Sequence, residues 1–480
     1  MPDSAGFRFN SDRVVFSGIN LKQSMPTRVT VNKLTFDRMN FFLVLKKAKE
    51  KKKTRFDLDM SFIQSYAGLM AGLKVDTTYL KDISLQYYTV GDSSVKSVKV
   101  NDIALKVRGI NIDTTMASLG MRDMVKNMTI DLRGRSYITN DSMYEIQSGL
   151  IRYDFPRKAI VVDSFYVMPR YPRKTFFEKA RYQTDRVKLF GKRMELRDFD
   201  FDDFFDNDHI HFGMLRLDEA DLRLYRDMKY PLKPGVYKPM PQEILRNLTQ
   251  KITVDTVDIR DSYLLYGEYS KKSENPGIAY FENFNIMAYH LTNNFSVIPD
   301  TTNFLIRMNT KVMGDARLDA TLRFPLMSLD DEFFITANSE KMDMTKLSQL
   351  TENILGISIV SGKGRIVYSD IKGDNIESSG TMLFKYRKFK LKMYDTEKSK
   401  VSSGFFAPVF NFMINGLMIK SYNPRFARTP RKGIVYYKRD TQRSVINYLW
   451  KSLLSGMLST MGINTKEQRQ QKKIIKKGED

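Results

Sequence analysis

Apolar and polar residues alternate in short runs along most of the chain, from about residue 14 to residue 393. Successive side chains of a β-strand point to opposite faces of a sheet, so this period of two predicts half-buried strands. In residues 316–324 every second residue is apolar, namely Ala316, Leu318, Ala320, Leu322 and Phe324. We therefore predict a mainly β protein with few helices.

Within residues 98–112 the apolar positions change parity at Asn101 and Asp102, which indicates a bulge or a tight turn. Helical spacing of apolar residues predicts short, core-covering helices at 60–73, 241–248 and 344–355, the last ended by Gly356. Strands are predicted at residues 28–45, 83–90, 98–112, 127–138, 159–168, 186–196, 212–225, 252–266, 278–290, 304–312, 316–324, 332–338, 364–371 and 378–393.

An internal repeat relates two parts of the chain. When Val75-Asp76-Thr77 is placed on Val254-Asp255-Thr256, three further pairs of identical residues fall into register: Asp82 with Asp261, Leu85 with Leu264 and Tyr87 with Tyr266. Repeats that cannot bury an apolar face alone stack on their neighbours and share a core. We favour a sheet of stacked repeats, and the alternative is a set of unrelated β-sandwich domains.

The 480 residues include no cysteine and only three histidines. The missing cysteines exclude disulfide frameworks, thiolate nucleophiles and cysteine-ligated metal centres. No phosphate-binding loop, dinucleotide-binding glycine pattern or serine-nucleophile elbow occurs. We therefore predict a protein that is not an enzyme and carries no cofactor.

One stretch is rich in residues that can bind metal: Asp198, Asp200, Asp202, Asp203, Asp206, Asp208, His209 and His211. Its first acidic residues alternate with phenylalanines and its histidines flank Ile210, which fits the solvated faces of two strands joined by a loop at 203–208. Neither a calcium-binding loop nor a zinc-binding helix motif is present. We predict no metal site here.

Lysine and arginine outnumber aspartate and glutamate by 78 to 55, which gives a net charge of +23. The basic residues gather in three clusters, within 46–55, 425–443 and 466–477. Such clusters attract polyanions, either nucleic acid or an anionic lipid surface. No recognition helix or RNA-binding sheet motif is evident, so we expect an anionic membrane surface rather than nucleic acid.

The C-terminal part has two apolar segments. Residues 404–419 form an apolar stretch interrupted by polar residues and too short to span a membrane. Residues 444–461 predict an amphipathic helix that carries the only tryptophan. Such a helix suits a membrane surface, and it suits equally the open end of a β core. The residues expected to contact the membrane are Ile446, Leu449, Trp450, Leu453, Leu454, Met457, Lys472 and Lys473.

Several phrases between residues 240 and 460 follow one another in a characteristic order. A short helix precedes VDTVDIRDSYLLY at 254–266, GIAYFENF at 277–284, IVSGKGRIVY at 359–368 and GDNIESSGTMLFKY at 373–386. This order resembles the AsmA-like superfamily of bacterial envelope proteins, which includes AsmA and TamB types, and the lysine- and tyrosine-rich style is similar to its Bacteroidetes members.

The resemblance implies an elongated, curled antiparallel β-sheet of stacked repeats that forms a groove with an apolar interior. A few short helices and the C-terminal amphipathic helix would complete the fold. Members of the superfamily usually have an N-terminal inner-membrane anchor, lie in the periplasm and are implicated in phospholipid transport to the outer membrane. The first 15 residues show neither a signal peptide nor such an anchor. A truncated start is therefore an open alternative.

We therefore expect a non-enzymatic envelope protein, periplasmic and membrane-associated, whose groove binds or conducts phospholipid acyl chains in outer-membrane lipid homeostasis. The first alternative is a structural scaffold of the envelope with a closed core and protein partners. The second is a basic nucleic-acid-binding protein. The expected parts are a repetitive groove (1–240), an AsmA-like β region (241–400), a membrane-proximal segment (401–462) and a basic disordered tail (463–480).

Overall fold

The computed structural model describes residues 6–22, 28–46, 72–90, 95–113, 128–271, 273–393, 419–425 and 428–478. It is mainly β, as predicted, and its 20 strands belong to a mixed sheet that stays open. The chain divides into two compact units. Unit 1 comprises Met1–Ser136, Gln147–Ser164 and Glu195–Asp198, and unit 2 comprises Tyr137–Ile146, Phe165–Met194 and Phe199–Asp480. The boundary that we expected at residues 240 and 241 falls inside unit 2.

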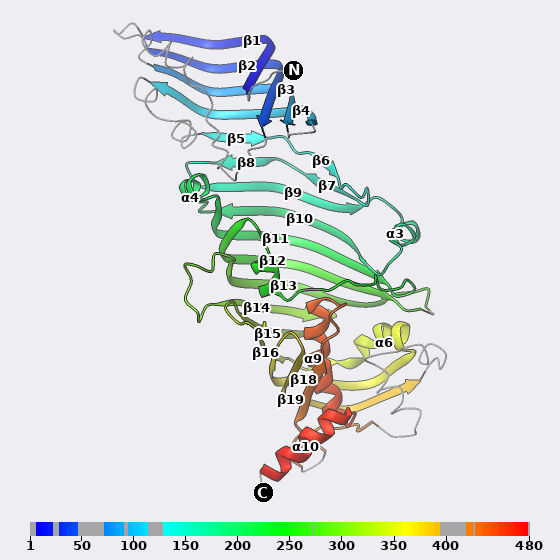
Figure 1. Cartoon of the computed structure of the whole chain (residues 1–480). Coiled ribbons are helices and arrows are strands. Elements are labelled where there is room, and N and C mark those ends of the chain that lie inside the picture. The colour runs from blue at the N-terminus through cyan, green and yellow to red at the C-terminus, as the bar shows by residue number, and fades with distance from the viewer. Residues whose placement is uncertain are drawn as a thin grey trace. The chain divides into compact units, whose positions relative to one another are not determined.

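The secondary structure confirms three of the predicted helices and the predicted strands, except that the strand expected at 127–138 is divided into β5 and β6 (Figure 1). The strands are β1 (Gly6–Lys22), β2 (Arg28–Lys46), β3 (Gly72–Val90), β4 (Val95–Asp113), β5 (Thr129–Leu132), β6 (Ser136–Ile138), β7 (Tyr144–Ser148), β8 (Ile151–Asp154), β9 (Ala159–Pro169), β10 (Asp185–Arg197), β11 (His209–Asp227), β12 (Lys251–Tyr269), β13 (Gly277–Thr292), β14 (Asn303–Val312), β15 (Ala316–Pro325), β16 (Phe333–Ser339), β17 (Met342–Asp343), β18 (Ile357–Gly373), β19 (Glu377–Met393) and β20 (Gly433–Lys438). The helices described are α3 (Arg173–Ala180), α4 (Phe201–Asn207), α5 (Pro241–Arg246), the 3-10 helix η1 (Met344–Leu347), α6 (Ser348–Leu355), α9 (Val445–Met461) and α10 (Lys466–Gly478).

The repeat seen in the sequence is a repeat of strand arrangement. In unit 1, β2 pairs in parallel with β3, and β3 pairs antiparallel with β4. In unit 2, β11, β12 and β13 follow the same pattern. The register shifts also correspond, because they fall around Ile83 in the first repeat and around Ser262 in the second. The stacked-repeat interpretation is therefore supported by strand pairing.

Two parallel pairs among the strand pairings described make the sheet mixed, whereas we expected an antiparallel one. Parallel neighbours need a connection that carries the chain back along the sheet, usually a dozen residues or more. Between β11 and β12 residues 228–250 provide this connection and include α5. The side-chain period of two is the same for both strand directions, so alternation alone did not reveal the parallel pairs.

One residue with a positive φ interrupts each central strand of both repeats. The four residues are Arg38, Asp82, Glu219 and Asp261, with φ between 47° and 52°. A bulge of this kind adds one residue to the strand. The apolar positions on either side are therefore three residues apart instead of two, and they stay on one face of the sheet: Phe36 and Met39, Leu80 and Ile83, Leu217 and Ala220.

The main core of unit 2 lies between the sheet and α9. The apolar row Leu322, Ile335 and Ile371 runs across three paired strands and packs in this core. Tyr448 of α9 is buried against Phe333, with the two rings edge to face at 5.2 Å. Figure 1 shows α9 crossing the strands near β18 and β19.

Three helices were not predicted. Residues 198–202, which we expected in a strand, lead into α4, because the Asp200 carboxylate accepts a hydrogen bond from the Asp203 N–H and caps the helix. The expected disordered tail contains α10, which begins with a reciprocal cap. The Thr465 N–H donates to the Gln468 side chain, and the Gln468 N–H donates to the Thr465 hydroxyl. Helix α3 has no cap of this kind.

Some predicted features lie outside the described residues. They are most of the first basic cluster, the helix expected at 60–71 and the apolar stretch at 404–418. Residues 72 and 73, the end of that expected helix, belong to β3.

A buried ion-pair network in unit 1 gives the first testable prediction. Asp131 of β5 binds Arg108 of β4 and Arg152 of β8, each at 2.7 Å, and its side chain is only 7 % exposed. Burial raises the pKa of Asp131, but the two guanidinium groups outweigh it and the pKa is lowered overall. Because the folded pKa lies below the unfolded one, this stabilisation is present above the ordinary pKa of 3.8 and is lost as the pH falls through the folded value.

Asp131→Asn should lower the free energy of unfolding at neutral pH by about 1–3 kcal/mol, since it leaves two arginines without their carboxylate. The measurement is urea unfolding between pH 7 and pH 2, where the difference from the unmodified protein should shrink at acid pH. Asp12→Asn is the control, because Asp12 pairs with Arg38 at the surface. Equal losses in the two variants would contradict the prediction.

Candidate functional site

One candidate surface is an apolar face on β1 to β3 and the adjoining part of β4. Paired strands align their apolar residues in rows across this face. The rows are Val14–Phe36–Leu80–Leu105, Phe16–Leu34–Thr78–Val107, Ile19–Val31–Val75–Ile110 and Leu21–Val29–Leu73. We call these residues the unit 1 apolar face. Side chains of several rows pack together, which confirms that they share one face.

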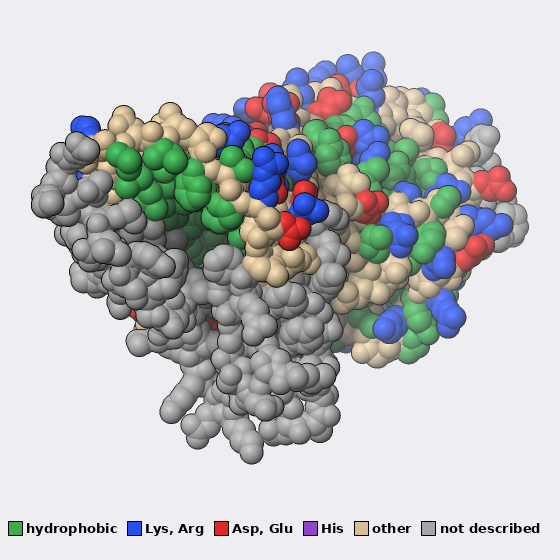
Figure 2. Space-filling model, turned by 90° about the horizontal axis from the view of Figure 1, so that it is seen from above, with side chains coloured by type: hydrophobic (Ala, Val, Ile, Leu, Met, Phe, Trp, Pro, Cys, Tyr) green, Lys and Arg blue, Asp and Glu red, His purple; other side chains and the backbone are tan. Residues whose placement is uncertain are grey.

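The edge strand β1 exposes its share of the unit 1 apolar face. Val14, Phe16, Ile19 and Leu21 are between 44 % and 61 % exposed, whereas Val31 and Val75 of the inner strands are buried. Figure 2 shows hydrophobic side chains gathered in a band over these strands, with lysine and arginine side chains nearby. Large apolar side chains that remain exposed together mark a surface suited to an apolar ligand or partner.

The opposite side of the same strands is polar. The row Ser17–Lys33–Thr77–Arg108 alternates with the apolar rows. Within the apolar rows Thr78 is the one polar residue, and its buried hydroxyl has no hydrogen-bond partner among the described residues. The described part of this face thus presents no acid, base or nucleophile, and the chemistry that it offers is burial of apolar groups.

Sequence reasoning did not assign these residues to a site. The signal that would have located them is the three-residue step between apolar residues, such as Val31 to Leu34 in β2 and Leu80 to Ile83 in β3. Read as simple alternation, the step looks like a break in a strand. Read as a bulge, it extends one apolar face along the whole strand.

Helix α9 caps the edge of the sheet in unit 2. Strand β20 pairs with β19 alone among the described strands, so one row of its backbone groups is free of ladder partners. The Ser459 hydroxyl accepts from the Ile434 N–H at 3.0 Å, and the Ser455 hydroxyl accepts from the Tyr436 N–H at 3.2 Å. The Gln468 amide of α10 donates to the Ile434 carbonyl at 2.7 Å. Covering an edge in this way prevents it from pairing with another strand.

The predicted membrane-contact residues fall into two groups. Leu449, Leu453 and Met457 pack against the core of unit 2, so they hold α9 on the sheet. Ile446 and Trp450 are 75 % and 48 % exposed. Leu454 is half-buried. Helix α9 therefore covers the sheet, as one of the two expectations had it, and contact of the exposed Ile446 and Trp450 with a membrane stays a prediction.

Of the two predicted lysines, Lys472 is bound inside the protein. Its ammonium group donates to the Asn464 side chain at 2.7 Å and to the Ser459 carbonyl at 3.4 Å. Burial, followed by the nearby charges of Lys420 and Arg431, lowers the pKa of Lys472 to about 8. The side chain of Lys473 lies outside the described residues.

Several arginines of the basic cluster at 425–443 are hydrogen-bonded within the protein. Arg431 donates to the Tyr386 hydroxyl at 3.0 Å and to the Thr460 carbonyl at 3.1 Å. Arg439 is buried and donates to two backbone carbonyls. Arg443 donates to the Gln183 side chain at 2.9 Å. These arginines join distant segments of unit 2 and do not form an open basic patch.

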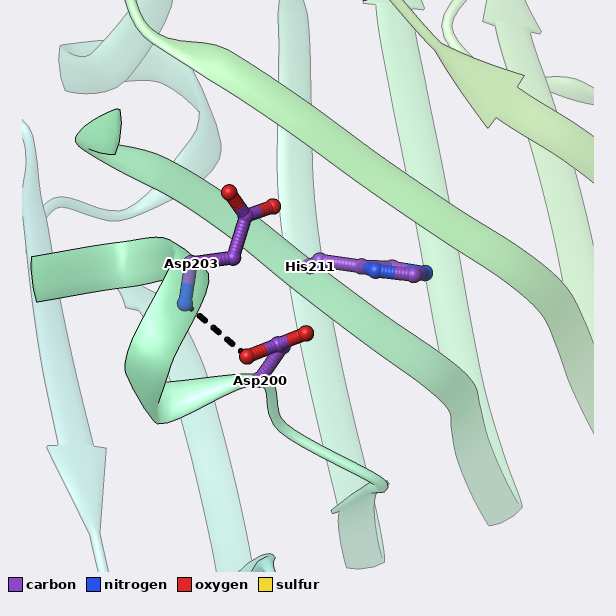
Figure 3. A group of neighbouring side chains, drawn as sticks. All are labelled: Asp200, Asp203 and His211. Carbon is purple, nitrogen blue, oxygen red and sulfur yellow. Dashed lines mark hydrogen bonds between the residues drawn. The ribbon is translucent and has the colours of Figure 1, made fainter. Parts of the chain in front are cut away.

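The ligand-rich stretch places Asp200, Asp203 and His211 close together (Figure 3), with one potential ligand atom from each within 4.8 Å of the others. Each of these side chains already has a protein partner. Asp203 binds Asn207 and His209, and these hydrogen bonds lower the pKa of its carboxyl. His211 contacts the Asp255 carboxylate of β12 at 3.1 Å. The group therefore joins α4 to β11 and β12.

No helix among the described residues is long and apolar enough to cross a membrane. No protein-family model matches the chain, and no curated protein matches it significantly.

The packing of α9 predicts different costs for residues on its two sides. Leu453→Ala should lower the free energy of unfolding by about 2–4 kcal/mol, because it removes buried methyl groups and leaves a cavity. Trp450→Ser should change it by less than about 1 kcal/mol, since the ring is half exposed. The two values are compared by urea unfolding, and a larger loss for Trp450→Ser would refute this packing.

The buried Lys472 predicts a pH-dependent stability. Its folded pKa of about 8 lies below its ordinary value of 10.5, so the unfolded chain binds more protons between these values. The unmodified protein should therefore gain stability relative to Lys472→Met as the pH rises from about 8 to about 10.5. Thermal unfolding across this range measures the difference, with Lys466→Met as the control for losing one lysine from α10. Parallel pH profiles for the unmodified protein and Lys472→Met would rule the effect out.

Proposed function

We propose that this chain is a non-enzymatic protein that binds or conducts phospholipid acyl chains on the unit 1 apolar face. The observation that carries the proposal is the set of aligned apolar rows on β1 to β4, exposed along β1. An acyl chain gains roughly 0.8 kcal/mol for each CH₂ that it buries, so a chain lying across these rows would be held by many small contributions.

Two further features agree with a lipid ligand. The net charge of +23 favours anionic membrane surfaces. The exposed Ile446 and Trp450 of α9 provide apolar groups that could enter such a surface. Together with the resemblance to the AsmA-like superfamily, these features lead us to propose a role in outer-membrane lipid homeostasis and a periplasmic, membrane-associated location.

The scaffold alternative also has an observation in its favour. In unit 2, α9 covers the apolar side of β18 to β20, so the same kind of sheet face forms an ordinary closed core there. If the unit 1 apolar face were covered by a protein partner in the same way, the chain would be structural. The amount of phospholipid bound to the purified protein distinguishes the two functions, because only the acyl-chain function requires it.

The first experiment identifies bound lipid. The protein is purified from a bacterial host without denaturant, washed in high salt and extracted with organic solvent, and the extract is analysed by mass spectrometry. We expect near-stoichiometric phospholipid, compared with a β-protein of similar charge. A folded protein that carries no lipid would exclude the acyl-chain proposal and favour the scaffold.

A variant pair tests the location of the site. Phe16→Ser combined with Ile19→Ser removes two exposed apolar side chains of β1 and should weaken lipid binding by about tenfold or more, because each contributes on the order of 1.5–3 kcal/mol when buried. Val15→Ser on the other face of β1 is the matched control. Bound phospholipid per protein, measured in the same extracts, should fall only in the double variant. Retention in both variants would place the lipid elsewhere.

A further inference from the structure

Four cationic side chains form a square on the neighbouring strands β18 and β19. Lys363 lies directly opposite Arg387 in the antiparallel register, and Arg365 lies directly opposite Lys385. Within each strand the two cations are two residues apart, so their side chains point to the same face. Directly opposed residues in such a pair have Cβ atoms about 4.5–5.5 Å apart. We call Lys363, Arg365, Lys385 and Arg387 the cation square.

The cation square faces away from α9. Tyr386, between Lys385 and Arg387, is buried in the core beneath α9, and its neighbours in the strand therefore point to the other side of the sheet. Lys363, Arg365 and Arg387 are exposed to solvent, and Lys385 is half-buried. Lys341 lies close by, and burial together with the charges of Arg387, Lys363 and Arg365 lowers its pKa.

Four arginines elsewhere on the sheet of unit 2 are neutralised locally. An aspartate two residues away on the same strand pairs with each of four arginines: Arg216 with Asp218, Arg223 with Asp221, Arg260 with Asp258 and Arg317 with Asp319. In the cation square the residue two positions away is a second cation. Like charges directly opposite each other destabilise a sheet. The square therefore differs from these four self-neutralised pairs.

One carboxylate lies beside the square and is hydrogen-bonded within the protein. Asp343 of β17 lies opposite Lys363 in the register. Its side chain accepts from the Thr345 N–H at 3.1 Å and from the Thr345 hydroxyl at 2.7 Å, which caps η1. No ion pair to the four cations is found among the residues that the structure describes. Asp343 therefore offsets part of the charge of Lys363. Most of the positive charge of Arg365, Lys385 and Arg387 is left for an external anion.

We propose that the cation square binds a phosphate-bearing anion. Phosphate oxygens suit this group, because a guanidinium can donate two parallel hydrogen bonds to them and an ammonium group adds a compact charge. Two sources offer the same chemistry, the headgroup of an anionic phospholipid and a soluble phosphate compound. The phospholipid source rests on the proposed function, whereas the soluble source does not.

The test compares two double variants with the same loss of charge. Lys363→Gln with Arg387→Gln removes one opposed pair of the square. Arg223→Gln with Arg317→Gln removes two arginines that already have aspartate partners. The probes are inorganic pyrophosphate in solution, measured by calorimetry, and phosphatidylcholine vesicles with and without phosphatidylglycerol, measured by flotation.

We expect the square variant to bind at least one probe about tenfold or more weakly than the unmodified protein, with the control variant close to unmodified. Pyrophosphate binding that depends on the square identifies a soluble phosphate source. Loss of binding only to phosphatidylglycerol vesicles identifies a phospholipid headgroup. Equal weakening of binding in both variants would mean that only net charge matters, and it would overturn the proposal. The proposal would also be overturned if the unmodified protein bound neither pyrophosphate nor the vesicles.

Stability provides a second readout that needs no ligand. Removing one opposed pair of like charges should leave the unfolding midpoint unchanged or raise it. A marked fall would show that these side chains are structural and would contradict the proposal. Because the unit 1 apolar face is not altered, co-purified phospholipid should persist in the square variant. The acyl-chain proposal and the phosphate site can therefore fail independently.

Discussion

Each of the strands β2, β3, β11 and β12 has to keep its apolar side chains on one face over 19 residues, and this constraint shapes both units. The strands meet it with one residue in a left-handed conformation, such as Asp82 or Asp261. That conformation costs on the order of 1–3 kcal/mol for a residue other than glycine. Turning the following apolar side chains into water would cost roughly 1.5–3 kcal/mol for each of them. The bulge is therefore the cheaper solution, and its repetition at matching positions aligns the apolar rows of neighbouring strands.

The same sheet has edges of two kinds. At β20 the edge is covered, because serine hydroxyls of α9 and the Gln468 amide of α10 bond the free backbone groups of Ile434 and Tyr436. Small side chains make this approach possible, since a Cβ on Gly456 would lie 2.8 Å from a methyl group of Val435. Strand β1 instead exposes Phe16 and Ile19, which belong to the unit 1 apolar face. One edge is thus closed by hydrogen bonds within the protein, whereas the strand at the other keeps large apolar side chains in contact with solvent.

The sequence predicted the strands well because most of them are buried on one side only. Alternation then survives in the residue pattern, as in residues 316–324 of β15. Helix α4 was missed because Asp200 and Phe201 fit a strand pattern equally well. The helix is favoured over a strand by the capping hydrogen bond from the Asp203 N–H and by the packing of Phe199 on Phe212, with ring centres 4.8 Å apart. The second of these is a contact between separate elements, which no local pattern contains.

The candidate sites were harder to predict for the same reason. The composition showed a strongly basic chain, but it did not show which lysines and arginines are hydrogen-bonded inside the folded protein. Arg431 and Lys472 belong to basic clusters in the sequence, yet both are occupied by hydrogen bonds within unit 2. The cation square, by contrast, takes its members from two strands, and only the register brings Lys363 opposite Arg387.

Net charge and local recognition are therefore separate properties of this protein. The opposite charges of an arginine and an aspartate two residues apart, such as Arg260 and Asp258, largely cancel in the electric field around the pair. Salt screens what remains of that field over about 10 Å. The cations of the square add instead of cancelling, because each lies directly opposite another cation in the register of β18 and β19. Lys363 alone of the four also lies opposite a carboxylate, that of Asp343, among the described strand pairs. An anion that approaches the polar face of unit 2 would meet self-neutralised pairs on β11, β12 and β15. It would meet a concentrated positive field on β18 and β19.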